Sequence, residues 1–222
     1  MQLSTEIFSF FSQLEQNNNR DWFEAHKPEF KALESSVKQF GEALKDKLNT
    51  HDSIDQFKVF RIYRDVRFSK DKTPFKTHFG MAFSREKPAL RGGYYLHLSP
   101  KDIFLACGFW DPNPEDLQRI RQELAVDGDE YHKLINTPDF KSVWGELQGE
   151  ALKTAPKGYP KDHPQIDLLR QKQHLFMVRY SEAQATAPDF LDRLNVALQA
   201  VRPFVDYMSN VLTTNADGER LL

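Results

Sequence analysis

Residues 94–109, YYLHLSPKDIFLACGF, contain two alternating runs separated by a turn, and they decide the expected fold class. In the first run apolar side chains fall at every second position, and in the second run both faces are apolar. A period of two is typical of β-strands, and two apolar faces are typical of a strand inside a sheet. The segment Ser99-Pro100-Lys101-Asp102 between them has turn chemistry. The sequence therefore predicts an antiparallel hairpin.

Three further segments are predicted to be strands. Residues 79–83 and 174–180 are short apolar runs, and residues 60–68 alternate between an apolar and a polar face. Arg64 breaks that alternation because it falls on the apolar face. A bulge can re-aim it, or it can point into a pocket and meet a partner there.

Long helices are expected near both ends of the chain. Apolar residues step by three or four between Pro28 and Leu48. The residue before a proline avoids the helical region, so this helix is predicted to begin at Pro28, after a separate short turn. A closing helix is predicted from about Pro188, with a kink at Pro203.

Strands cluster in the middle of the chain, helices flank them, and hairpins rather than crossovers link the strands. This arrangement predicts an α+β fold, with one mostly antiparallel sheet of about five strands flanked by long N- and C-terminal helices. A single domain over residues 1–222 is expected for a chain of this length.

Composition excludes several classes of protein. Cys107 is the only cysteine of the sequence, which excludes an intramolecular disulfide framework and four-cysteine zinc modules. No apolar run approaches the roughly 18 residues of a membrane span. The N-terminus lacks a basic start and carries Glu6 inside its apolar patch, unlike a signal peptide. We therefore expect a cytoplasmic protein with no membrane partner.

Standard cofactor and metal signatures are missing from the sequence. It holds no Gly-rich phosphate loop, dinucleotide fingerprint, HExxH or GxSxG motif. The seven histidines never reach a ligand spacing. His78 and His97, on neighbouring predicted strands, are interpreted as hydrogen-bonded structural residues. No cofactor and no metal site are expected.

The candidate site is the segment KVFRIYRDVRFSKDKTPFK at residues 58–76, the basic segment. It carries seven basic and two acidic side chains, a net charge of +5 in a chain whose net charge is −2. Such crowding is costly without a counter-charge, and the planar guanidinium of arginine binds carboxylate or phosphate through two hydrogen bonds. The expected ligand-binding residues are Arg61, Arg64, Arg67, Lys72 and Lys76. Asp65 and Asp71 are candidate catalytic residues, which would orient the arginines or accept a proton.

Other interpretations of the basic side chains stay open. Arg61, Asp65 and Arg67 can form an ion-pair ladder on one face of the sheet, with the lysines solvated. Nucleic-acid binding is also possible, with stacking on bases by Tyr94, Tyr95 and Trp110. A second basic set is interpreted as a solvated surface loop; it consists of Lys153, Lys157, Lys161, Arg170 and Lys172.

The string RDVRFSKDKTPFK at residues 64–76 resembles the signature of a large family, the domain of unknown function numbered 2461. That signature has the form R-D-x-R-F-x-x-D-K-x-P-[YF]-K. Its positions are occupied here by Arg64, Asp65, Arg67, Phe68, Asp71, Lys72, Pro74, Phe75 and Lys76. The similarity extends to FFSQLEQNNNRDWFEAHK, to the strands from GGYYLHLSP to GFW, and to PKGYPKDHPQIDLLRQK. The resemblance implies a site in the basic segment but no particular activity or cofactor.

Three functions follow as hypotheses. The first is a site for a small ligand bearing phosphate or carboxylate, with or without turnover. The second is nucleic-acid binding. The third is a non-catalytic interaction protein whose motif is a structural ion-pair core. The sequence leaves the oligomeric state open.

Overall fold

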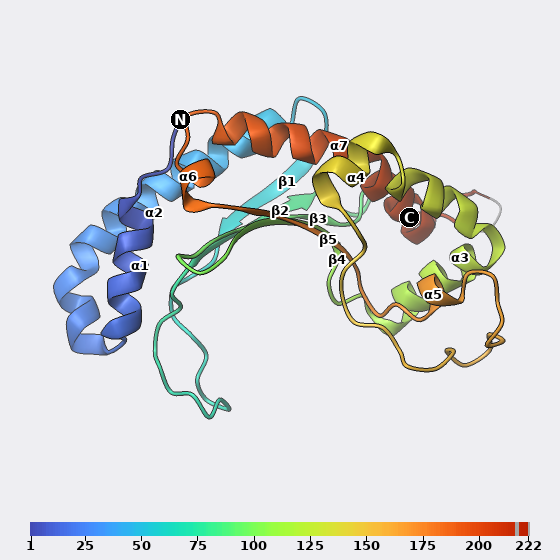
Figure 1. Cartoon of the computed structure of the whole chain (residues 1–222), viewed down its shortest axis with the longest axis horizontal. Coiled ribbons are helices and arrows are strands. Elements are labelled where there is room, and N and C mark those ends of the chain that lie inside the picture. The colour runs from blue at the N-terminus through green and yellow to red at the C-terminus, as the bar shows by residue number, and fades with distance from the viewer. Residues whose placement is uncertain (216–217, 222) are drawn as a thin grey trace. The chain divides into compact units, whose positions relative to one another are not determined.

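The computed structural model describes residues 1–215 and 218–221. Its helices and strands follow one another along the chain as labelled in Figure 1. The helices are α1 (Glu6–Gln16), α2 (Arg20–Leu48), α3 (Pro114–Ile135), α4 (Pro138–Trp144), α5 (Ile166–Leu169), α6 (Glu182–Ala185) and α7 (Phe190–Thr213). The strands are β1 (Ile54–Val59), β2 (Phe79–Arg85), β3 (Gly93–Leu98), β4 (Ile103–Phe109) and β5 (His174–Tyr180).

The strands form one five-stranded antiparallel sheet in the order β1-β2-β3-β4-β5. The predicted fold class is therefore confirmed. The predicted hairpin joins β3 to β4, where the amide of Ser99 donates to the carbonyl of Asp102 at 3.2 Å. Along β3 buried and half-buried residues alternate, as a strand with one covered face requires.

The chain forms two compact units. The first consists of Met1–Phe83, Tyr95–Leu105 and Arg179–Val196, and the second of Ser84–Tyr94, Ala106–Val178 and Ala197–Leu222. Strands β2 to β5 and helix α7 contribute residues to both units.

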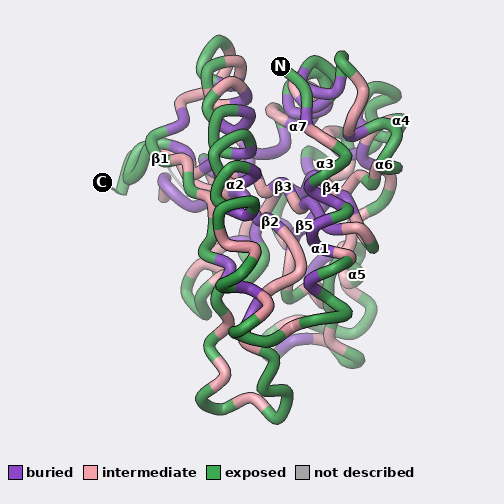
Figure 2. Tube along the Cα trace, turned by 90° about the vertical axis from the view of Figure 1, so that its left-hand side faces the viewer, coloured by how far each residue is buried: buried purple, intermediate pink, exposed green. Residues whose placement is uncertain are grey.

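In the first unit, aromatic side chains join α1 and α2 to the sheet. The ring of Phe79 on β2 lies 4.9 Å from the ring of Phe11 and 5.5 Å from that of Phe30, measured between centroids. All three side chains are buried. Figure 2 shows α2 with a purple, buried side and a green, exposed side, as its apolar stripe predicts.

Helix α2 begins at Arg20, so the predicted start at Pro28 is wrong. The side chain of Asn19 accepts a hydrogen bond from the amide of Trp22 and begins the helix eight residues earlier than Pro28. Pro28 lies inside the helix. Phe23 and Phe30, before and after Pro28 in the helix, are both buried, and their ring centroids lie 5.3 Å apart. Most helical stability comes from such tertiary packing, which a proline inside the helix does not remove.

The strand predicted over residues 60–68 is also wrong, because β1 ends at Val59. Residues 60–78, the 60–78 loop, leave β1, extend away from it and return to β2 (Figure 1). At its base the amide of Arg64 donates to the carbonyl of Pro74 at 2.9 Å, and Tyr63 bridges Phe75. Side chains alternate in this short ladder with the same period of two as in a strand of the sheet. The alternation in the sequence therefore could not distinguish a paired loop from a sheet strand.

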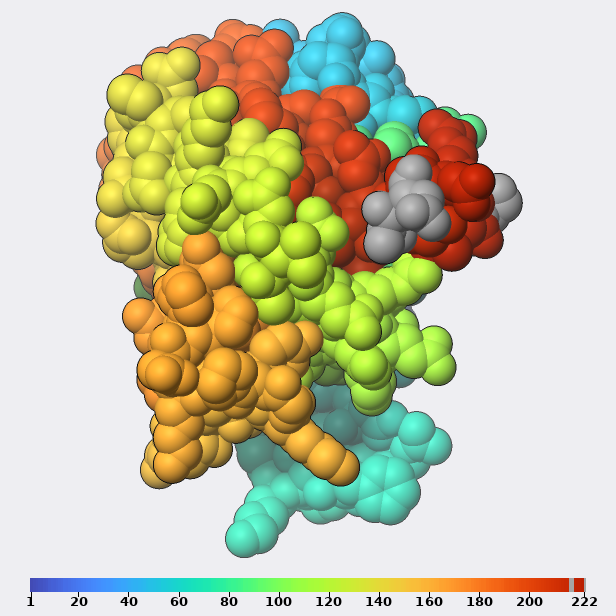
Figure 3. Space-filling view, turned by 90° about the vertical axis from the view of Figure 1, so that its right-hand side faces the viewer, coloured from blue at the N-terminus to red at the C-terminus, as the bar shows by residue number. Residues whose placement is uncertain are grey.

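The second unit contains α3, α4 and α5, with the proline-rich segment, residues 153–164, between α4 and α5. Asn113 and Thr137 cap α3 and α4 through their side chains, as their cap-plus-proline sequences predict. Helix α3 is interrupted at Asp127, whose φ of −137° and ψ of 70° are not helical. Figure 3 shows the orange atoms of the proline-rich segment lying against the green atoms of α3.

Candidate functional site

The base of the 60–78 loop borders a hollow of about 440 Å³ in the first unit, the Arg64 pocket. The end of α1, the loop and the entry to β2 each contribute to it. Its lining residues are Glu15, Asn18, Arg64, Asp71, Thr73, Phe75, Lys76, Thr77 and His78. Three of the seven predicted site residues, Arg64, Asp71 and Lys76, therefore meet around one pocket.

Asn18 fixes the loop to the end of α1. Its amide nitrogen donates to the carbonyl of Phe75 at 3.0 Å, and its side-chain oxygen accepts from the amide of Phe75 at 3.1 Å. The ring of Phe75 is buried and stacks on that of Phe23, with a centroid separation of 4.1 Å. Both contacts hold the pocket wall in place.

Arg64 is oriented by groups that follow it in the same loop. Its Nη1 donates to Oδ2 of Asp71 at 2.5 Å and to the carbonyl of Thr73 at 3.2 Å. Nε and Nη2 have no hydrogen-bond partner among the residues that the structure describes. The Nε and Nη2 edge of a guanidinium can donate two parallel hydrogen bonds to a carboxylate or phosphate.

Asp71 is held in its charged form. Hydrogen bonds from the backbone and hydroxyl of Thr73, together with the bond from Arg64, lower the pKa of Asp71 to about 2. Its acceptors are engaged by these donors at neutral pH. The geometry therefore supports the predicted orienting role of Asp71 rather than that of a proton acceptor.

Lys76 is the second cation of the pocket. Its ammonium lies 5.7 Å from the centroid of the Phe60 ring, a cation–π distance. Within residues 1–215 and 218–221, no carboxylate pairs with it. Its charge also helps to lower the pKa of His78.

Two histidines that sequence reasoning assigned to structure lie beside these cations. The rings of His78 and His97 are 4.2 Å apart between centroids. Burial, then the nearby His97 and Lys76, lowers the pKa of His78 to about 4. Burial also lowers the pKa of His97, whose Nδ1 lies 3.1 Å from the hydroxyl of Tyr95. Both imidazoles are thus neutral near pH 7 and can accept a proton.

A signal for this pair existed in the sequence. His78 lies two residues after Lys76, at the entry to one strand, and His97 lies on the next strand. Neighbouring antiparallel strands bring side chains of one face together, so their pairing followed from the predicted sheet.

The other four predicted residues lie outside the pocket lining. Arg67 donates to Asp65 through both Nε, at 2.9 Å, and Nη2, at 2.6 Å. These side chains are 77% and 47% exposed, and their mutual hydrogen bonds lower the pKa of Asp65. Lys72 donates to the carbonyl of Val66 at 2.9 Å. Arg61 is exposed.

The ion-pair ladder of the alternative interpretation is present only in part. Asp65 and Arg67 pair, but they lie in the 60–78 loop and not across a sheet. The three residues expected to stack on bases differ in exposure: Tyr94 is buried, Tyr95 is half-buried and Trp110 is 63% exposed.

The structure was searched for metal-binding clusters and for membrane-spanning helices over residues 1–215 and 218–221. No group of three or more His, Cys, Asp or Glu side chains in the described part of the chain is placed to hold a metal ion. None of the helices there has the length and apolar character needed to cross a membrane.

An α+β fold with this sheet and the motif at residues 64–76 defines the class of the protein. A family model described as "conserved hypothetical protein (DUF2461)" matches residues 6–207, and the chain belongs to this family. Comparison with curated proteins and with solved structures found no match.

Proposed function

We propose that the Arg64 pocket binds a small anionic ligand through a phosphate or carboxylate group. The observation that carries this proposal is the position of two cations in one hollow. Arg64 keeps its Nε–Nη2 edge without a partner among the described residues, and Lys76 has no carboxylate beside it. Arg64 can bind an anion through two parallel hydrogen bonds, and Lys76 adds a compact positive charge; these are the two usual means of anion recognition.

The carboxylates of the pocket support this reading because each already has a cation. Asp71 pairs with Arg64, and Glu15 pairs with Lys101 on the β3–β4 turn. The charge of Lys76 is therefore not neutralised within the lining. A bound anion would supply the missing counter-charge in a partly enclosed place, where an ion pair is worth more than on open surface.

Turnover of the ligand is part of the proposal. A neutral His78 in the lining can take a proton from a bound hydroxyl or ammonium group, with His97 beside it. In this scheme Asp71 is a positioning residue, which acts through Arg64. The proton acceptor is thus His78 rather than either aspartate of the basic segment.

Nucleic-acid binding remains the second candidate because of Phe68. This side chain is 97% exposed in the 60–78 loop, and the guanidinium of Arg67 lies 6.0 Å from its ring centroid. An exposed ring among cations suits stacking on an unpaired base. Loss of retardation of a single-stranded oligonucleotide with Phe68→Ala, at low salt, would support it.

The proposal is tested by thermal shift with phosphate, pyrophosphate and citrate. A ligand that binds the folded state alone raises the melting temperature with concentration. We expect stabilisation of the wild type that falls strongly in Arg64→Gln and Lys76→Gln. Lys70→Gln is the matched control, since Lys70 is an exposed cation of the same loop outside the lining. Equal stabilisation of all four proteins, or of none, contradicts the proposal.

A further inference from the structure

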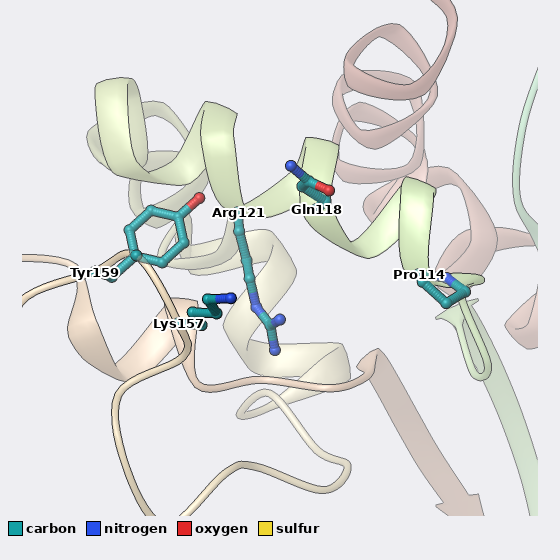
Figure 4. Close-up of a pocket in the computed structure, with 6 residues that line it drawn as sticks. Pro114, Gln118, Arg121, Lys157 and Tyr159 are labelled. Carbon is teal, nitrogen blue, oxygen red and sulfur yellow. The ribbon is translucent and has the colours of Figure 1, made fainter.

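A second hollow of about 540 Å³ lies in the second unit, between α3 and the proline-rich segment (Figure 4). We call it the Arg121 pocket. Helix α3 contributes residues spaced by three or four, and the segment after α4 contributes the opposite wall. The lining residues are Pro114, Gln118, Arg121, Lys157, Gly158 and Tyr159. The volume is in the range of small-molecule sites.

Arg121 is held rigidly at the centre of this lining. Its Nε donates to the carbonyl of Leu169 at 2.8 Å, and its Nη2 donates to the carbonyl of Gln171 at 3.2 Å. Nη1 has no partner in the described ranges 1–215 and 218–221. Two backbone carbonyls thus fix the plane of the guanidinium, so that little side-chain entropy remains to be lost on binding.

The pocket is cationic and contains no counter-charge. None of its six lining residues is acidic. Burial lowers the pKa of Arg121. A half-buried guanidinium without a carboxylate is costly, and a bound anion removes that cost.

Three further side chains of the lining carry hydrogen-bond donors, and they belong to Lys157, Tyr159 and Gln118. Lys157 makes no ion pair with any residue that the structure describes, and Figure 4 shows its ammonium directed toward the Arg121 side chain. Burial raises the pKa of Tyr159, so its hydroxyl stays protonated at neutral pH. The amide of Gln118 lies one turn before Arg121 on the same face of α3.

We propose that the Arg121 pocket binds the phosphate group of a small phosphomonoester. Two positive charges, Arg121 and Lys157, match the charge of about −2 that a phosphomonoester carries near neutral pH. A phosphate group offers three oxygens to the guanidinium and the ammonium, whereas a carboxylate offers two. The ring of Tyr159 and the side chain of Pro114 lie on opposite sides of Arg121 (Figure 4), and each gives an apolar surface for the rest of the molecule. This site is separate from the Arg64 pocket and does not depend on it.

The test uses titration calorimetry with phenyl phosphate as the probe, on the double variant Arg64→Gln/Lys76→Gln. This background removes the cations of the Arg64 pocket. Adding Lys157→Gln is expected to weaken binding by about tenfold, since one charge-assisted hydrogen bond contributes about 1.5 kcal/mol or more. Adding Lys161→Gln is the control, because Lys161 is an exposed cation of the same segment outside the lining. Its binding should stay within twofold.

Three outcomes would overturn the inference. The first is unchanged affinity in the Lys157→Gln variant, and the second is an equal loss with Lys161→Gln, which indicates diffuse charge rather than a site. The third is equal binding of benzoate, which contradicts phosphate selectivity. Lys157 is exposed and makes no hydrogen bond within the described residues, so its variant folds even if Arg121 variants do not.

Discussion

Asp71 accepts a hydrogen bond of 2.5 Å from Nη1 of Arg64, and the opposite edge of the guanidinium is left without a partner among the described residues. An arginine whose hydrogen bonds involve one nitrogen is held in orientation, and its other nitrogens keep donors for a ligand. Arg67 differs, since both its Nε and its Nη2 are bound to Asp65. Two arginines three residues apart thus have different capacities to bind an anion.

Asp71→Asn tests whether this orientation matters. The amide keeps an acceptor for the Thr73 amide but loses the charge that attracts Arg64. We expect phosphate affinity to fall by about tenfold through a less ordered Arg64, with circular dichroism unchanged because Asp71 is exposed. Calorimetric titration of wild type and variant checks this. An Asp65→Asn variant with the same loss would argue for a general charge effect instead.

Gly80→Ala tests the packing beside the histidine pair. A Cβ at this position would lie 2.5 Å from the hydroxyl of Tyr95, which is itself 3.1 Å from Nδ1 of His97. Tyr95 must move, and we expect a loss of about 1–3 kcal/mol in the free energy of unfolding, measured in urea. Adding Tyr95→Phe to Gly80→Ala should recover part of this loss. No recovery would show that the clash lies elsewhere.

Asn18→Ala tests the attachment of the 60–78 loop. The substitution removes two hydrogen bonds to the backbone of Phe75, a loss of about 1–2 kcal/mol in local stability. We expect faster hydrogen exchange at the amides of Arg64 and Lys76, which are bonded within the loop ladder. Asn17→Ala is the control, because the side chain of Asn17 donates to the carbonyl of Gln13 in α1 rather than to the 60–78 loop. Equal exchange in both variants would contradict this attachment.

The buried pair Tyr131 and His174 predicts a pH dependence of stability. The hydroxyl of Tyr131 lies 3.0 Å from Nδ1 of His174, and neither side chain is exposed. Burial lowers the pKa of His174 to about 3 from the ordinary value of 6.5. Below pH 6.5 the unfolded chain therefore binds a proton that the folded chain does not, so stability falls as the pH falls.

The expected loss from His174 is about 2 kcal/mol between pH 7.5 and pH 5, measured by urea unfolding at each pH. His78, whose pKa is lowered to about 4, adds a loss of the same sign. In His174→Asn the loss should shrink by about 2 kcal/mol, because asparagine does not titrate but can still accept from Tyr131. An unchanged pH dependence in this variant would refute the assignment.

The sequence predicted four of the five strands, β2 to β5, because these carry local signals. The period of two in residues 94–109 and the turn at Ser99 to Asp102 identify the hairpin without tertiary information. The predicted helix start at Pro28 and the predicted strand over residues 60–68 were wrong, because the structure of both segments depends on contacts with residues that are not their neighbours in the sequence. In α2 the rings of Phe23 and Phe30, before and after the proline, are buried with centroids 5.3 Å apart. Tyr63 pairs with Phe75 inside the 60–78 loop rather than with a strand of the sheet.

The candidate site was predictable to the extent that it is local. Arg64, Asp71 and Lys76 come from one motif, and the structure gathers them around one pocket. His97 lies beside His78 through the pairing of β2 and β3, which followed from the predicted sheet, although both histidines were interpreted as structural residues. Arg121 was missed because the carbonyls that hold it lie about fifty residues away in the sequence.

The most direct measurement is an NMR titration of the arginine Nε–H signals with inorganic phosphate. We expect a saturable shift of the Arg64 signal in the wild type and its loss in Lys76→Gln, since the proposed anion contacts both cations. The Arg67 signal, engaged by Asp65, should stay in place. An Arg64 signal that does not move, or that moves only as far as that of Arg67, would contradict anion binding in the Arg64 pocket.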